Sequence, residues 1–171
     1  MNEQQVAEIL KGLKSAIRAE FEGYHFYMMA SRNTDDPDGR ETFQHFARDE
    51  FEHMNFLQAQ FDSLVKNHQP DETLLLKKVE PSNEESSIFT REIMARIQDA
   101  HQEMTILSVG IQLELNALQM YRELSREAGD PIVAGFYREL SEWESSHYRR
   151  LIAQQDALKD AYWSANHFHP F

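Results

Sequence analysis

The stretch FQHFARDEFEHMNFLQAQF (residues 43–61) decides the fold class, because charged residues interrupt a stripe of apolar ones. Phe46, Leu57 and Phe61 fall on one side of a helix, and Glu50 and His53 fall on that same side. A three-residue step turns only about 60° around a helix, so Glu50 and His53 point the same way. The stretch therefore predicts a helix that buries a carboxylate and an imidazole together.

The same pattern returns near the end of the chain. Glu144 and His147 lie between Leu140 and Leu151, again on the apolar side of a predicted helix. Each residue of this second Glu-x-x-His pair follows its counterpart in the first pair by 94 positions. The repeat predicts a duplicated helical unit.

Two further glutamates obey the same offset. Glu20 lies on the inner stripe of the first predicted helix, and Glu114 lies 94 positions later on that of the third. Each is followed seven residues on by a tyrosine, Tyr27 and Tyr121. Such an aromatic residue is either packing or a phenol that hydrogen-bonds a ligand carboxylate.

Helical periodicity and turn residues divide the chain into four long helices within one domain, residues 1–171. The predicted helices span about 3–32, 40–67, 103–128 and 131–159, with a crossover at 68–102 that holds a short helix and an irregular tail at 160–171. The turns are NTDDPDG (33–39) and EAGDP (127–131). We expect an all-α four-helix bundle of two antiparallel hairpins joined by the long crossover.

All four glutamates fall at one level of this bundle. Asp35 is the midpoint of the first glutamate pair and Gly129 that of the second, and both lie within the turns. Each glutamate is therefore about fifteen residues, or roughly 22 Å, from its turn.

Composition excludes several classes of function. The formal net charge of -12 disfavours nucleic acid and anionic membrane surfaces as partners. The absence of cysteine excludes disulfides, thiolate zinc sites and iron–sulfur clusters within the chain. No apolar run reaches the length of about 18 residues that a membrane span needs, and the polar start does not resemble a signal peptide. We expect a cytoplasmic protein.

Four carboxylates and two imidazoles in an apolar bundle are strongly destabilising unless something neutralises them. Two divalent cations balance four ionised glutamates. One Glu from each of two helices plus Glu-x-x-His from each of the other two is the ligand pattern of di-iron and di-manganese carboxylate proteins. The predicted metal ligands are Glu20, Glu50, His53, Glu114, Glu144 and His147.

Other residues receive simpler interpretations. Glu22 and His25 have the same three-residue spacing but point away from Glu20, so we place them on an outer face. His167 and His169 belong to the tail, which we expect to be solvated. The residues expected in the core are Phe21, Phe46, Trp143, Met28, Met54 and Met120.

These motifs resemble the rubrerythrin branch of the ferritin-like superfamily, over roughly Glu8 to Leu158. The resemblance implies two iron ions, or alternatively manganese or a mixed iron–manganese pair. Glu50 and Glu144 would bridge the metals, Glu20 and Glu114 would cap one metal each, and each histidine would supply one nitrogen. The implied activity is an iron-dependent oxidoreductase that reduces peroxide or O2 with oxidation of Fe(II).

The chain departs from that family pattern in two ways. Rubrerythrins typically carry another glutamate three residues after the third-helix ligand, where this chain has Ala117. The four cysteines of a rubredoxin module are missing, so electrons would come from an external donor protein. The resemblance also implies a homodimer. Alternatives on the same scaffold are manganese catalase, an oxygenase, iron storage and a metal-free structural bundle.

Overall fold

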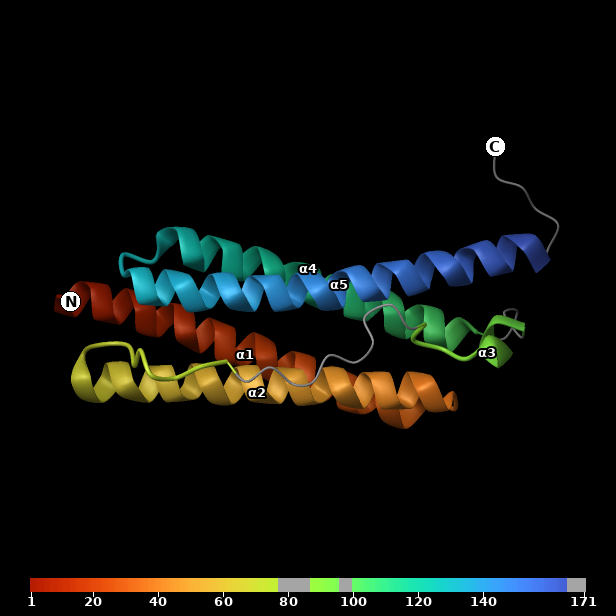
Figure 1. Cartoon of the computed structure of the whole chain (residues 1–171), viewed down its shortest axis with the longest axis horizontal. Coiled ribbons are helices and arrows are strands. Elements are labelled where there is room, and N and C mark those ends of the chain that lie inside the picture. Colours follow the sequence, from red (N-terminus) through yellow and green to blue (C-terminus); the bar gives the residue numbers. More distant parts are fainter. Residues whose placement is uncertain (77–86, 96–99, 166–171) are drawn as a thin grey trace.

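The computed structural model describes residues 1–76, 87–95 and 100–165, and this part of the chain contains five helices and no strand (Figure 1). The helices are α1 (Glu3–Asn33), α2 (Pro37–Asn67), α3 (Arg91–Ala95), α4 (His101–Glu127) and α5 (Pro131–Ala165). The predicted all-α bundle of two hairpins and a crossover is confirmed. Among the described helices, none is long and apolar enough to cross a membrane.

The two hairpins lie side by side. Helix α1 packs along α2 and α4 packs along α5, while α1 and α4 form the main contact between the hairpins. The α1–α2 turn and the α4–α5 turn lie at opposite ends of the bundle (Figure 1).

Capping residues set the helix starts. Asn2 and Gln5 form a capping box at the start of α1. Asp36 accepts a hydrogen bond from the Gly39 amide at 2.8 Å, and Pro37 occupies the first turn of α2. Helix α2 thus begins three residues before the predicted start at residue 40, because the cap and the proline favour it.

The end of the crossover is fixed to both hairpins. Asp36 also accepts hydrogen bonds from the amide and hydroxyl of Thr90, which joins the crossover to the first turn. The Gln154 side chain accepts from the Ile88 amide at 2.8 Å. Phe89 packs so closely on Gly39 that a Cβ there would lie 2.6 Å from the ring. These contacts hold α3 and the start of α4 against the bundle.

Helix α5 is longer than predicted. Its helical backbone continues to Ala165, so the prediction of an irregular tail from residue 160 is wrong for residues 160–165. The side chain of Leu158 is fully buried near this end, which provides packing for the extra turns. His167 and His169 lie outside the described residues.

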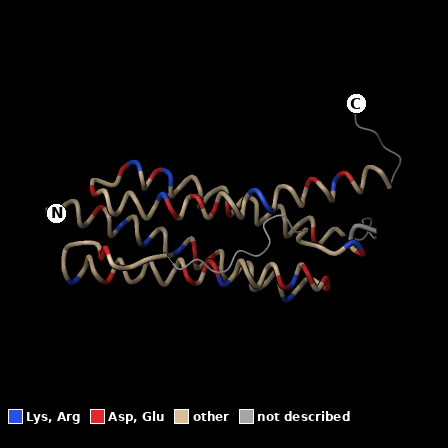
Figure 2. Tube along the Cα trace, in the orientation of Figure 1, with Lys and Arg blue, Asp and Glu red and all other residues tan. Residues whose placement is uncertain are grey.

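The core consists of two apolar clusters separated by a polar layer. One cluster, towards the α1–α2 turn, includes Phe43, Phe46, Phe89, Leu107 and Leu151. The other, towards the α4–α5 turn, includes Leu13, Leu57, Leu64, Val133 and Leu140. Acidic residues occur along all four long helices (Figure 2), and the four buried glutamates at the middle of the bundle lie between the residues of these clusters, namely Glu20, Glu50, Glu114 and Glu144. Both ends of the bundle therefore provide apolar packing for a charged middle.

Not every residue predicted for the core is buried. Phe46 is 1% exposed, but Phe21 is 51% exposed, so its assignment to the core is wrong. Phe21 follows Glu20 directly and therefore points about 100° away from the buried face. The remaining residues predicted for the core are partly buried, namely Trp143, Met28, Met54 and Met120.

Candidate metal centre

Six charged side chains meet in the polar layer of the bundle. Each of the four long helices contributes one glutamate, and α2 and α5 each add a histidine one turn further on. All six residues are at most 5% exposed, namely Glu20, Glu50, His53, Glu114, Glu144 and His147. The structure thus brings together every residue that the sequence predicts as a ligand.

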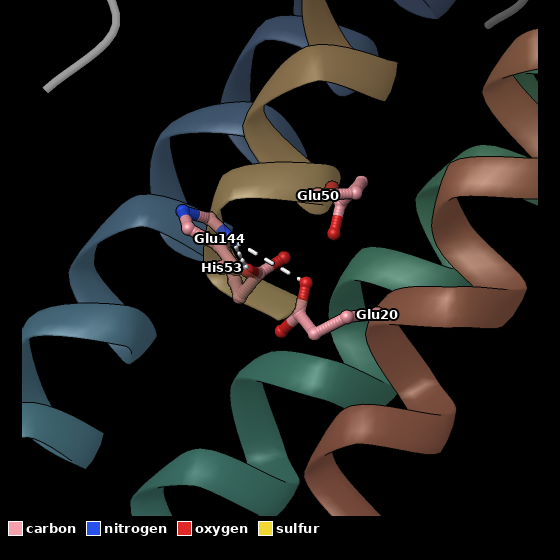
Figure 3. Close-up of side chains that lie close together, drawn as sticks. All are labelled: Glu20, Glu50, His53 and Glu144. Atoms are coloured by element: carbon pink, nitrogen blue, oxygen red, sulfur yellow. Dashed lines mark ion pairs between the residues drawn. The ribbon is translucent and has the colours of Figure 1, made fainter. Parts of the chain in front are cut away.

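The six residues form two overlapping groups whose potential ligand atoms lie within 4.8 Å of one another. The first group contains Glu20, Glu50, His53 and Glu144 (Figure 3). The second contains Glu50, Glu114, Glu144 and His147. Glu50 and Glu144 belong to both groups, so each can serve two ions at once.

The histidines face the carboxylates through the same ring atom. His53 Nδ1 lies 3.4 Å from both Glu20 Oε2 and Glu144 Oε1 (dashed in Figure 3). His147 Nδ1 lies 3.4 Å from Glu50 Oε1 and 3.7 Å from Glu114 Oε1. Neither Nδ1 atom makes a hydrogen bond. Both imidazoles therefore present an unpartnered nitrogen to the centre of the cluster.

Each of the two predicted tyrosines donates a hydrogen bond to a glutamate that belongs to only one of the groups, and that glutamate lies on the other hairpin. Tyr27 on α1 donates a hydrogen bond to Glu114 Oε1 on α4, and Tyr121 on α4 donates to Glu20 Oε1 on α1. Burial and the nearby carboxylates raise the pKa of both phenols well above the ordinary value, so they remain donors. Each glutamate thereby keeps its second oxygen, Oε2, without a partner.

The four carboxyl groups divide into two pairs by proton affinity. Burial and the neighbouring carboxylates raise the pKa of Glu50 and Glu144 well above its ordinary value. Burial opposes the ionisation of Glu20 and Glu114 too, but hydrogen bonds and the nearby histidines lower the pKa of both. The two shared glutamates therefore have a higher proton affinity than Glu20 and Glu114.

The residues fit a pair of metal ions. Each of the six side chains has one buried oxygen or nitrogen atom without a hydrogen-bond partner. Such orphaned atoms are costly, at about 1–3 kcal/mol each and more when charged. Carboxylate oxygen and imidazole nitrogen are suitable ligands for iron, manganese and zinc. The donor set, the burial and the unmet bonding capacity of the cluster therefore suit it to hold metal ions.

Sequence analysis missed Asp49, which supports one histidine from outside the cluster. Asp49 is 3% exposed, and its Oδ2 lies 3.2 Å from His147 Nε2 and 3.7 Å from His45 Nε2. A carboxylate on the outer ring nitrogen fixes the orientation and tautomer of a ligand histidine. The signal in the sequence was an acidic residue next to Glu50, but the sequence does not show which histidine it reaches.

A small cavity connects the cluster with the surface between α1 and α4. It has a volume of about 130 Å³ and is lined by all four glutamates. The exposed residues Glu22 and Asn116 form its rim, whereas small residues at Gly23 and Ala117 leave room inside. A Cβ on Gly23 would lie 3.2 Å from Glu50 Oε2, so larger side chains there would press on that carboxylate. The cavity gives small molecules access to the shared glutamates.

The other Glu-x-x-His pair lies outside the site. Glu22 and His25 are both exposed, and Glu22 forms an ion pair with Arg18 at 2.9 Å. Neither residue belongs to the two groups of potential metal ligands.

Fold and site together define a ferritin-like bundle with a carboxylate–histidine metal centre. The family model for Rubrerythrin matches residues 11–106, more than half of the chain, and the chain belongs to the Rubrerythrin family. The match includes Glu20, Glu50 and His53. The comparisons with curated proteins and with solved structures gave no match. The second hairpin, with Glu114 and the second Glu-x-x-His pair, therefore joins the site on structural grounds.

Proposed function

We propose that the chain binds two iron ions in this cluster and reduces peroxide or O2 while Fe(II) is oxidised. The observation that supports the proposal is a buried set of four carboxylates and two imidazoles, each with one unpartnered atom, beside a cavity that reaches the surface. A pair of ferrous ions would supply the two electrons that reduction of peroxide to water requires.

The individual residues have distinct tasks in this proposal. Glu50 and Glu144 would be shared between the ions, since they belong to both groups. Glu20 and Glu114 would each bind through Oε2, because a tyrosine occupies Oε1. The histidines would bind through Nδ1, the atom that faces the carboxylates. Binding requires the loss of any protons on the two shared glutamates.

The size of the cavity favours a small oxidant over an organic substrate. Its volume of about 130 Å³ is well below the roughly 300–1,000 Å³ that is usual for small-molecule sites. Peroxide and O2 fit such a space, whereas most organic substrates of oxygenases do not. The 171 residues contain no cysteine, so a cysteine-ligated electron donor would lie outside these residues.

The first test is metal analysis of purified protein, followed by anaerobic reduction and addition of peroxide. We expect close to two irons per chain and a ferric absorption band that appears as peroxide is consumed. Less than half an equivalent of any transition metal after reconstitution would contradict the proposal. Manganese at the same stoichiometry would favour a catalase, and many irons per chain in a cage-sized particle would favour storage.

A matched pair of variants tests whether the cluster holds the metal. His53→Ala should remove one of the two ions, because it deletes the only imidazole of the first group. His25→Ala provides the control, since His25 follows Glu22 at the same spacing on an exposed face. Equal metal content in both variants would show that the ions bind elsewhere.

A further inference from the structure

A second and larger cavity lies away from the metal centre, between the N-terminal half of α1 and the α4–α5 turn. It has a volume of about 450 Å³, within the usual range of roughly 300–1,000 Å³ for small-molecule sites. Its apolar walls include Ile9, Leu124 and Val133. This cavity shares no lining residue with the one beside the glutamates.

One polar group in the wall of this cavity has no partner. Tyr137 is 1% exposed, and its hydroxyl makes no hydrogen bond within the described structure. Its ring is held firmly, with the Tyr121 ring at a centroid distance of 5.9 Å and the Phe136 ring at 4.6 Å. A buried tyrosine hydroxyl normally finds a hydrogen-bond partner. The missing partner is therefore expected to come from whatever occupies the cavity.

Gly12 and Leu124 pack closely around this hydroxyl, so a partner in the cavity reaches it only when the Leu124 side chain moves. A Cβ on Gly12 would lie 3.2 Å from Tyr137 Oη and 2.8 Å from Leu124 Cδ2. The hydroxyl thus faces a notch in α1 that exists because residue 12 has no side chain. Beside it lies the end of Leu124, a flexible and only half-buried side chain that can turn aside.

The charges around the cavity indicate which molecules it can accept. The lining includes two acidic residues, Glu8 and Glu127, and one basic residue, Lys11. The chain as a whole carries a formal charge of -12. The net negative charge of the lining and of the chain disfavours an anion, and the apolar residues beside Tyr137 favour an uncharged molecule there.

We propose that this cavity binds a neutral, mainly apolar molecule of about the size of phenol, whose oxygen atom hydrogen-bonds to the Tyr137 hydroxyl. The site is separate from the metal centre. Its test therefore does not depend on metal content or on the proposed oxidoreductase activity.

Three matched probes test the proposal, namely 4-fluorophenol, 4-fluorotoluene and 4-fluorobenzoate. Each is titrated with the full chain and followed by fluorine NMR of the probe. The phenol should bind about fivefold more tightly than the toluene, since it adds one net hydrogen bond. The benzoate, an anion, should bind more weakly than the phenol. Absence of phenol binding at millimolar concentration, or equal affinity for phenol and toluene, would overturn the proposal.

Tyr137→Phe then removes the hydroxyl alone and keeps the shape of the wall. Its affinity for 4-fluorophenol should fall to that for 4-fluorotoluene, and its urea midpoint should stay the same or rise because the lost hydroxyl had no partner. Tyr24→Phe, a half-buried tyrosine of α1 outside the cavity, should leave the fivefold preference unchanged. A preference for phenol that persists in Tyr137→Phe would show that another group binds the oxygen.

Discussion

The two halves of the metal centre have the same ligand types but different supports. Trp143 follows Asp49 by 94 residues, the same offset that relates the ligands, so the two residues occupy equivalent positions in the two halves. Asp49 reaches the outer nitrogen of His147 at 3.2 Å, whereas the Trp143 ring packs edge-on against His53 with a centroid distance of 5.7 Å. One histidine is therefore held by a carboxylate and the other by an aromatic ring.

This difference makes the two ion positions unequal. A carboxylate partner raises the basicity of a histidine ligand and fixes its tautomer, which a ring contact does not do. The residues that would touch the metals repeat at the offset of 94, whereas Asp49 and Trp143, which occupy equivalent positions next to them, differ. We expect the ion next to His147 to be held more tightly than the ion next to His53.

The largest expected effect comes from a residue that both halves share. Glu50→Ala removes a carboxylate that belongs to both groups, so we expect both ions to be lost rather than one. Metal analysis after reconstitution measures this result, with Glu20→Ala as the comparison that should lose only one ion. Retention of one full equivalent in Glu50→Ala would mean that this glutamate is not shared.

A smaller effect on metal affinity is expected from the two residues that differ between the halves. Asp49→Asn keeps the shape of the side chain but removes its charge, and we expect metal affinity next to His147 to fall about 10–100-fold. Trp143→Phe, at the equivalent position of the other half, should change affinity by no more than about twofold because no charge is lost. Stepwise titration with Fe(II) under anaerobic conditions measures both. Equal losses in the two variants would contradict the predicted inequality.

Low pH should weaken metal binding in both halves of the site. The raised pKa values of Glu50 and Glu144 favour proton binding by these groups in the metal-free protein, and metal binds only the ionised form. Lower pH therefore favours the metal-free state, and affinity should rise with pH by about tenfold per unit for each proton displaced. Titrations at several pH values, together with direct measurement of released protons, provide the check. Affinity that is constant with pH would show that the shared glutamates are already ionised.

The smallest expected effect concerns the tyrosines, for which the halves are alike. Tyr27→Phe and Tyr121→Phe each delete one hydrogen bond to a buried carboxylate. Each should lower the free energy of unfolding of the metal-free protein by about 1–3 kcal/mol, because a buried carboxylate oxygen loses its hydrogen-bond donor. Urea denaturation followed by circular dichroism measures both. A marked difference in unfolding free energy between the two variants would show that the two halves also differ in how strongly the tyrosines stabilise them.

Periodicity made much of the architecture predictable. The apolar stripes and the two turns indicate four long helices, and the equal distance of each glutamate from its turn places the four carboxylates at one level. The errors occurred where local signals were weak. The chain after Lys159 lacks a strong stripe, yet α5 continues to Ala165, and Phe21 continues the period of α1 but faces solvent.

The sequence by itself determined the helices, their pairing within each hairpin and the six side chains that meet, because helical spacing is a local property that residue order fixes. Only the tertiary structure decided which partners act across the hairpins. Tyr27 reaches Glu114 rather than its own Glu20, Asp49 reaches His147 rather than His53, and Tyr137 faces Gly12 without a partner. These contacts depend on how two hairpins rotate and slide against each other, and no spacing within either hairpin specifies that.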